Sequence, residues 1–441
     1  MAEEFTCDVD KQYRSACKDL PKYSGSRYCV LHEPDEAKNK EDFEEAKKSK
    51  LDREDYDFRG TVFPEGTSVF QGFEFEANVS FEGAKFSGQW TSFSEAQFGP
   101  TVAETALMKE LNSQDLTTTD FKGAKFSGER TSFNGAKFRT ANTSFQGAEF
   151  SAAYTSFADE EFGIKAKEVT FSKEVNFRDV TFRERAAFLG SQWNPIFDSR
   201  AWAQFHGSRI EKPELLTFFN NVLLHPGWFV NVDVRKVDFT DVKWYGMPGG
   251  PEGTLSEEIN ALEDRNVESP HTLLAQACRR LSANAEDNRE YPLANGFHYW
   301  SMDAVRKGSW KYFKDLTLKG LLKKETWHDI GERFGLITTL YWLLNGYGVR
   351  AARAFLVLMG MWAIFTTFYV LVDPSEFKDF GQGIGYLWQT AVYSLLAMVR
   401  LNPEPTPGEP GLFQFLVGLE GILGPLQIAL LALAVRRKVM R

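Results

Sequence analysis

Phenylalanine recurs through the first half of this 441-residue chain at intervals that neither a helix nor a plain strand produces. The interval alternates largely between five and seven residues, which gives a twelve-residue unit. The recurring residues are Phe58, Phe63, Phe70, Phe75, Phe81, Phe86, Phe93, Phe98, Phe121, Phe126, Phe133, Phe138, Phe145, Phe150, Phe157, Phe162, Phe171, Phe177, Phe182 and Phe188. This pattern predicts a solenoid, in which each unit buries its phenylalanine by stacking on the next turn.

The clearest units read Gly-Ala-Lys-Phe at 123–126 and 135–138 and Gly-Ala-Glu-Phe at 147–150. They resemble the pentapeptide-repeat family, in which the centre residue is Leu or Phe and the residue two positions earlier is small. The resemblance implies a right-handed quadrilateral β-helix over residues 58–260, with an irregular C-terminal part that includes a terminal repeat. Two extra residues at every second corner depart from the family pattern and predict wider corners. The insertion at 99–120 is expected to form a loop with a short helix.

Two apolar stretches near the C-terminal end predict a membrane hairpin. Residues 354–372 carry no charge, and a helix of these 19 residues is about 28 Å long, enough to cross the hydrocarbon core. Residues 412–435 contain one charged residue, Glu420. The apolar segment 384–399 is short for a span and predicts a re-entrant helix. Because basic residues flank the hairpin on both outer sides, both termini and the coil are expected on the cytoplasmic side of a bacterial inner membrane.

The order of span, short helix and span resembles the two-transmembrane potassium-channel superfamily over residues 354–441. As a whole, the chain resembles pentapeptide-repeat membrane proteins with a C-terminal ion-channel-like domain. The resemblance implies a homo-oligomer, by analogy a tetramer, embedded in the lipid bilayer. The segment after the short helix has no Thr-Val-Gly-Tyr-Gly run, so potassium selectivity is not predicted.

Candidate pore and gating residues are the polar, glycine and proline residues of this region. Glu420 is an ionisable residue inside a span, and it is expected either to line a conduction path or to fix helix packing through a hydrogen bond. Gly424 and Pro425 are expected to kink the second span, either as a hinge or as a static bend. The connection after the first span is mainly acidic, so in an oligomer it would concentrate cations unless Arg400 faces the axis. The remaining candidates are Ser394, Arg400 and Glu404.

Residues 334–353 predict an interfacial helix, because the apolar run before Arg350 is too short to span. Tyr341 and Trp342 suit the headgroup region, and Arg350 and Arg353 would anchor the helix there. It is expected either to couple the cytoplasmic part to the first span or to act as a plain anchor. The preceding segment, 261–333, is predicted to contain a cytoplasmic helical pair and a linker. This pair resembles the helical hairpin that precedes the spans of pentapeptide-repeat membrane proteins.

Residues 1–34 contain Cys7, Cys17, Cys29 and His32. Three thiolates and one imidazole in a short polar segment can close a tetrahedral shell around Zn²⁺, which predicts a zinc-knuckle-like module with a structural zinc ion. The alternative is free cysteines in a flexible tail. Residues 35–57 are strongly charged and predict a solvated helical spacer.

No catalytic constellation is recognisable, so an enzyme is not expected. The net charge of -9 gives no support for nucleic-acid binding. Some pentapeptide-repeat proteins are acidic mimics of DNA, but Lys85, Lys125 and Lys137 are expected on the exterior of the coil, which therefore lacks a strongly acidic face. The leading hypothesis is an oligomeric ion-channel-like membrane protein whose cytoplasmic coil receives an unknown protein or ligand. The alternatives are a membrane-anchored scaffold without conduction and a membrane-disrupting effector.

Overall fold

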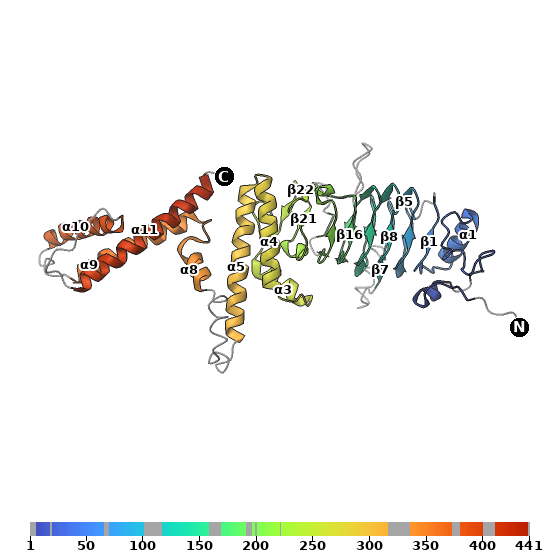
Figure 1. The fold of residues 1–441 in the computed structure, drawn as a ribbon, viewed down its shortest axis with the longest axis horizontal. Coiled ribbons are helices and arrows are strands. Elements are labelled where there is room, and N and C mark those ends of the chain that lie inside the picture. Colours follow the sequence, from blue (N-terminus) through green and yellow to red (C-terminus); the bar gives the residue numbers. More distant parts are fainter. Residues whose placement is uncertain are drawn as a thin grey trace. The chain divides into compact units, whose positions relative to one another are not determined.

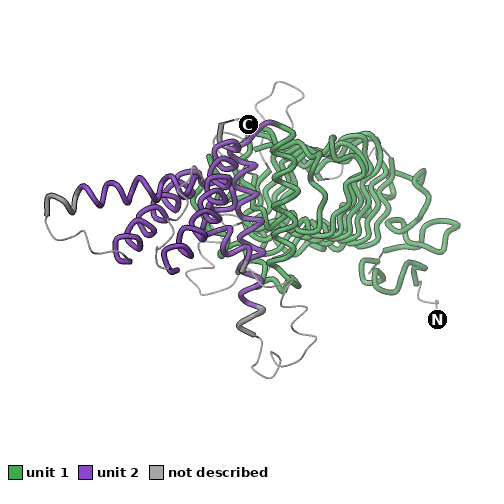
Figure 2. The backbone as a smooth tube through the Cα atoms, turned by 60° about the vertical axis from the view of Figure 1, so that its left-hand side comes forward, with its two compact units in different colours: residues 1–288 green, residues 289–441 purple. Residues whose placement is uncertain are grey.

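The computed structural model describes residues 6–17, 20–65, 70–100, 117–157, 169–190, 196–198, 201–220, 222–315, 336–372, 380–399 and 411–439. The chain forms two compact units, residues 1–288 and 289–441 (Figure 2). The first unit is a coil of short parallel strands with helical elements at both of its ends (Figure 1). The second unit is helical. Phe162, the inserted residues 101–116 and the connection after the first apolar helix lie outside the described residues.

Successive strands of the first unit return in rotation to four parallel sheets. The first sheet contains β1 (Val62–Phe63), β4 (Lys85–Phe86), β8 (Lys125–Phe126), β12 (Glu149–Phe150), β16 (Thr181–Phe182) and β19 (Arg209–Ile210). The second contains β2 (Glu74–Phe75), β6 (Gln97–Phe98), β10 (Lys137–Phe138) and β14 (Thr170–Phe171). The third contains β3 (Val79–Ser80), β7 (Thr118–Asp120), β11 (Asn142–Ser144), β15 (Glu174–Asn176) and β18 (Trp202–Gln204).

The fourth sheet closes the rotation with β5 (Trp90–Ser92), β9 (Arg130–Ser132), β13 (Tyr154–Ser156), β17 (Arg185–Leu189), β20 (Leu216–Phe219) and β22 (Asp238–Thr240). A small fifth sheet pairs β21 (Leu223–Leu224) with β23 (Lys243–Trp244). The register places Lys125 beside Glu149, 24 residues further on, so one turn contains two of the twelve-residue units. The predicted stack of parallel strands is therefore confirmed.

The core of the coil is built from columns of stacked phenylalanine rings. In one column Phe93, Phe133 and Phe157 stack nearly parallel, with ring centroids 5.2 and 4.9 Å apart. Neighbouring columns meet edge to face, as Phe93 and Phe121 do at 5.3 Å. Each ring is buried, and the small residue two positions earlier, such as Ala136, is fully buried as well. The five-and-seven spacing is thus the spacing of residues that face one continuous aromatic core.

The two residues that lengthen every second interval lie in three-residue strands of the third and fourth sheets. β9 buries only its middle residue, Thr131, and β11 buries only Thr143. Side chains alternate along a strand, so the middle threonine points into the coil and its neighbours point away. The hydroxyl of Thr143 lies 3.2 Å from that of Thr140, which lies 3.2 Å from that of Thr119. The expected wider corners are therefore strand segments with an inward threonine.

The N-terminal end of the coil is covered by α1 (Lys40–Leu51), whose Phe43 is fully buried. Lys47 lies over the ring of Phe70, with Nζ 5.6 Å from the centroid, and Lys50 lies over Phe58 at 5.8 Å. These rings belong to the first turns of the aromatic columns, so the two ammonium groups cover π faces that have no further ring to stack on. The predicted helix is confirmed, but the expected solvated spacer is wrong, because the helix closes the apolar end of the coil.

The opposite end of the coil is covered by α3 (Leu255–Asp264) and α4 (Pro270–Asp287), beside the short helices η2 (Pro213–Leu215) and η3 (Pro226–Phe229). The amide of Asn284 in α4 donates to the carbonyls of Val234 and Val237, at 2.9 and 2.8 Å. Glu258 in α3 accepts a hydrogen bond of 2.8 Å from the amide of Gly227. Backbone groups that the last turn leaves without a strand partner are thus satisfied by helix side chains.

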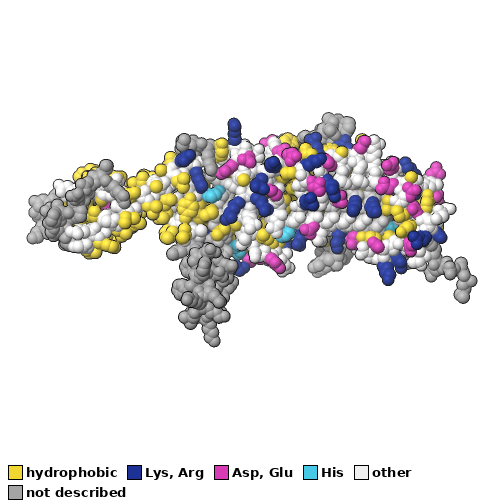
Figure 3. All heavy atoms as spheres, in the orientation of Figure 1, with side chains coloured by type: hydrophobic (Ala, Val, Ile, Leu, Met, Phe, Trp, Pro, Cys, Tyr) yellow, Lys and Arg dark blue, Asp and Glu magenta, His cyan; other side chains and the backbone are white. Residues whose placement is uncertain are grey.

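The second unit contains α5 (Tyr291–Asp315), α8 (Leu336–Asn345), α9 (Ala351–Val372), α10 (Phe380–Met398) and α11 (Gly411–Val439). Among the described helices only α9 and α11 are long and apolar enough to cross a membrane. They contain the two predicted spans. The predicted interfacial helix is shorter than expected and ends at Asn345, because Gly346, Tyr347 and Gly348 have positive φ angles that no helix contains. On the face shown in Figure 3, hydrophobic side chains gather over α9 to α11, whereas charged side chains cover the coil.

Candidate metal centre and polar cluster of the apolar helices

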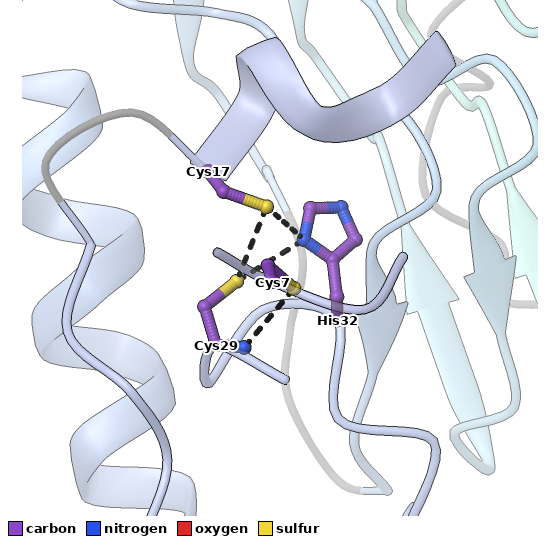
Figure 4. Close-up of side chains that lie close together, drawn as sticks. All are labelled: Cys7, Cys17, Cys29 and His32. Carbon is purple, nitrogen blue, oxygen red and sulfur yellow. Dashed lines mark hydrogen bonds between the residues drawn. The ribbon is translucent and has the colours of Figure 1, made fainter. Parts of the chain in front are cut away.

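The four predicted ligands come together at the N-terminal end of the first unit (Figure 4). Cys17 ends the short helix η1 (Lys11–Cys17), and Cys29 and His32 lie on one turn, in which the amide of His32 donates to the carbonyl of Cys29. The sulfurs of Cys17 and Cys29 are 3.6 Å apart, and Nδ1 of His32 lies 2.9 and 3.1 Å from them. All four ligand atoms, with the sulfur of Cys7, lie within 4.8 Å of one another.

The imidazole of His32 is oriented by a hydrogen bond outside the cluster. Its Nε2 lies 2.8 Å from the carbonyl oxygen of Arg59, which only accepts, so Nε2 carries the proton and donates. That tautomer leaves the Nδ1 lone pair directed at the thiols, an arrangement that metal-binding histidines commonly use. The amide of Val62 donates to the carbonyl of Leu31 at 2.9 Å, which fixes the turn against the first strand of the coil.

The donor set fits Zn²⁺. In a tetrahedral site with Zn–S bonds of about 2.3 Å, two sulfurs stand roughly 3.8 Å apart, close to the separation of Cys17 and Cys29. A hydrogen bond from Cys17 outweighs burial and lowers the pKa of Cys29 to about 4, so this ligand is a thiolate at neutral pH. The same pairing, with burial, raises the pKa of Cys17. The predicted cluster is confirmed; the identity of the metal as zinc stays a prediction, and an ion there would crosslink a segment with little core of its own.

A second cluster joins the three apolar helices of the other unit around Glu420. This residue of α11 is fully buried. Tyr369 of α9 donates to Oε2 at 2.5 Å, and Ser394 of α10 donates to Oε1 at 2.5 Å. Both carboxylate oxygens therefore accept hydrogen bonds from the same chain. These contacts are of the kind expected if Glu420 fixes helix packing, the second of the two roles that the sequence left open.

Gly424 of α11 lies directly against Met398, the last residue of α10. A Cβ placed on it would lie 2.5 Å from both Cγ and the carbonyl oxygen of Met398, so a side chain there would push the helices apart. Pro425 lies inside α11, which continues on both sides of it. The other pore candidates, Arg400 and Glu404, lie outside the described residues.

The four predicted interfacial anchors lie together with α5. The guanidinium of Arg353 is 5.0 Å from the ring centroid of Trp342 and donates to its carbonyl at 3.1 Å. Trp342 donates from Nε1 to the hydroxyl of Tyr299 on α5 at 3.0 Å, and Arg350 lies over the Tyr299 ring at 4.7 Å. Tyr341, the fourth anchor, contacts Tyr347 with ring centroids 5.8 Å apart. The anchors therefore link α5, α8 and the start of α9.

Sequence reasoning missed the buried contacts of Tyr347 and Gln427. Tyr347 is buried and donates to Asp303 at 3.3 Å; burial and then the charge of Asp303 raise its pKa, so its hydroxyl remains protonated. Gln427 is a buried amide in the second predicted span, and it donates to the carbonyls of Leu344 and Ala354, at 3.1 and 2.8 Å. A polar residue inside an apolar stretch was the signal that identified Glu420, and the same signal applies to Gln427.

No family model, curated protein or solved structure matches this chain, so the functional argument depends on its own residues.

Proposed function

We propose that this chain is an oligomeric, ion-channel-like membrane protein whose cytoplasmic coil binds a partner or ligand and is coupled to a two-span domain. In this proposal α9 and α11 cross the bilayer and α10 enters it as a re-entrant helix. The coil is a right-handed quadrilateral β-helix of the pentapeptide-repeat type. Both termini face the cytoplasm, and in a bacterium the protein resides in the inner membrane.

The attachment of α10 to both long helices carries the proposal. Ser394 of α10 bonds to Glu420 of α11, and Trp362 of α9 donates from Nε1 to the carbonyl of Ala391 in α10 at 2.9 Å. Polar groups in hydrocarbon are costly unless protein groups satisfy them, so these bonds favour one assembled three-helix unit over three independent helices. A helix attached to both spans is what a pore-type arrangement requires.

Conduction also requires several copies, because two spans of one chain cannot enclose an aqueous path. The apolar helices expose large hydrophobic side chains that are available to lipid and to neighbouring copies. The most exposed on α9 and α11 are Phe355, Leu356, Ile364, Leu371, Leu412, Phe415, Ile422 and Leu426. A homotetramer is the form that the two-span channel analogy favours.

A membrane-anchored scaffold is the second candidate, and the burial of Glu420 favours it. Glu420 is fully buried and each of its carboxylate oxygens accepts a bond from the same chain, so within one chain it faces neighbouring helices rather than an open path. In that case the three-helix unit only tethers the coil, and the coil carries the function by binding another protein. A membrane-disrupting effector would instead arrest growth on expression, in a manner that depends on residues 384–435.

Reconstitution separates these candidates. The mass of the detergent-solubilised protein is measured first, and the protein is then placed in planar bilayers with and without the Arg400→Ala substitution. A channel predicts an oligomer whose cation conductance changes when this positive charge is removed from the connection, whereas the exposed coil variant Lys137→Ala leaves conductance unchanged. A monomer, or an oligomer that shows no conductance under any condition, would favour the membrane-anchored scaffold. Protease protection of sealed cells tests the orientation independently.

A further inference from the structure

A cavity of about 460 Å³ lies where α9 begins. It is lined by side chains from α5, from the turn before α9, from the first two turns of α9 and from the end of α11. The lining residues that the argument uses are Asn295, Arg350, Ala352, Arg353, Leu356 and Arg437. Arg350 and Arg353, about one helical turn apart, thus border one open space together with Arg437, which lies 84 residues after Arg353.

Their positive charge is not neutralised within the described part of the chain. Arg353 donates to the carbonyl of Trp342, Arg437 donates to the carbonyl of Tyr347 at 3.1 Å, and Arg350 lies over an aromatic ring. No carboxylate among the described residues forms an ion pair with any of the three. Carbonyls and rings therefore hold the guanidinium groups in place and leave their charge to attract an anion.

The start of α9 adds hydrogen-bond donors at the same place. The first helical bond runs from the amide of Ala354 to the carbonyl of Arg350, so the amides of residues 351–353 have no acceptor inside the helix. No acidic residue occupies the first turn, and no described side chain accepts from these amides. All three residues line the cavity. Free amides and the helix dipole favour a negatively charged ligand here.

We propose that this cavity binds the phosphate head group of an anionic glycerophospholipid. The ligand is a lipid rather than a free phosphate because the cavity continues onto apolar surface. Leu356, which lines it, is 68% exposed, and the adjacent Phe355 is 51% exposed, so an acyl chain would follow α9 away from the arginines. Basic residues at the cytoplasmic ends of membrane helices attract such head groups. The inference depends on the membrane placement of α9 and α11, but not on conduction.

Native mass spectrometry of the full chain in detergent tests the site, with phosphatidylglycerol and phosphatidylcholine of equal acyl length as probes. We expect preferential retention of phosphatidylglycerol. Arg350→Gln and Arg437→Gln should each weaken it about five-fold, the contribution typical of one basic residue near an anionic head group. Arg436→Gln is the matched control, because Arg436 is exposed, carries the same charge and does not line the cavity. It should leave retention within about two-fold, well short of that contribution.

A second variant separates loss of the site from loss of folding. Ala352→Asp places a carboxylate in the first turn of α9, where it favours the helix but repels a phosphate. We expect this variant to keep or raise the unfolding temperature in detergent and to lose the preference for phosphatidylglycerol. Retention of that preference would overturn the inference.

The source of the phosphate is decided by competition with glycerol 3-phosphate. If the lipid site exists, a millimolar excess of glycerol 3-phosphate leaves phosphatidylglycerol bound, because glycerol 3-phosphate has no acyl chains to contact the apolar surface of α9. Complete displacement would assign the cavity to a soluble phosphate and overturn the lipid assignment, as would equal retention of both lipids. Resistance of the wild-type protein to alkaline carbonate extraction reports membrane placement separately, so failure of the lipid site can be told from failure of the membrane proposal.

Discussion

Gln427 of α11 donates a hydrogen bond of 2.8 Å to the main-chain carbonyl of Ala354 in α9, and both residues are buried. Glu420 lies seven residues earlier on α11, about two helical turns, so the two polar side chains share one face of the helix. That face contacts α9 at both points, since Glu420 accepts from Tyr369. The pairing of the two apolar helices is therefore specified by hydrogen bonds at two levels.

Replacing Glu420 with Ala should destabilise the three-helix unit. The substitution leaves the hydroxyls of Tyr369 and Ser394 buried without their acceptor, and each unsatisfied group costs about 1–3 kcal/mol. We expect a clear decrease in the unfolding temperature in detergent, and a smaller decrease for Glu420→Gln, which keeps an acceptor oxygen. A double-mutant cycle with Tyr369→Phe should show coupling between the two positions. Additive effects would contradict the bond.

Gly424→Ala should separate α11 from α10. Its Cβ would lie 2.5 Å from the carbonyl oxygen of Met398, a contact that neither helix can relieve without moving. Gly418→Ala is the control, because an added Cβ there meets nothing within 4 Å and alanine is the better helix former. We expect crosslinking between cysteines placed on α10 and α11 to decrease only in Gly424→Ala. Equal crosslinking in both variants would contradict the close contact between α11 at Gly424 and the end of α10.

The purified protein should contain one zinc ion per chain, bound by the single Cys and His cluster of the described residues. Cys29→Ser and His32→Ala each remove one ligand and should lower the metal content measured by elemental analysis. Loss of metal should also increase hydrogen exchange around residues 20–34, because the ion crosslinks a segment with little core. Cys278→Ser, which removes a cysteine far from the cluster in sequence, should retain the full metal content. Equal metal loss in that control would indicate adventitious binding.

Cys278 should resist alkylation in the folded protein at pH values where an ordinary thiol reacts. It is fully buried in α4, and burial raises its pKa, so the reactive thiolate is both inaccessible and disfavoured. A chelator should make the three N-terminal cysteines reactive while Cys278 stays protected, and denaturant should expose all four. Peptide mass spectrometry after iodoacetamide treatment identifies each site. Early modification of Cys278 would show that α4 opens locally.

Phe133→Ala should weaken the centre of the coil. The ring stacks between Phe93 and Phe157, and truncation of a buried phenylalanine costs about 3–5 kcal/mol. We expect faster hydrogen exchange in β9, which directly precedes Phe133, and in its two sheet neighbours, β5 and β13. Phe133→Leu keeps most of the apolar volume and should change exchange much less. If both variants exchange alike, the stacked aromatic contact contributes little beyond volume.

Much of the fold could be predicted because burial leaves a period in the sequence. The phenylalanine spacing indicated a stack of parallel strands, and the uncharged stretches indicated α9 and α11. The 35–57 segment shows where this reasoning fails. Its charges indicate a solvated helix, yet Lys47 and Lys50 are buried because their ammonium groups cover aromatic rings at the end of the coil. The composition of a segment does not show that its charged side chains will contact aromatic rings from another part of the chain.

By itself, the sequence determined which residues face inward along the coil, which helices are apolar enough for a membrane, and which four side chains can bind a metal. Those properties are local, because they depend on the alternation and composition of neighbouring residues. Only the tertiary structure decided that Tyr369, 51 residues before Glu420, and Ser394, 26 residues before it, donate to its two oxygens. It likewise brought Arg350, Arg353 and Arg437 to one cavity. Such contacts depend on how the chain runs between distant segments, which a local sequence pattern does not predict.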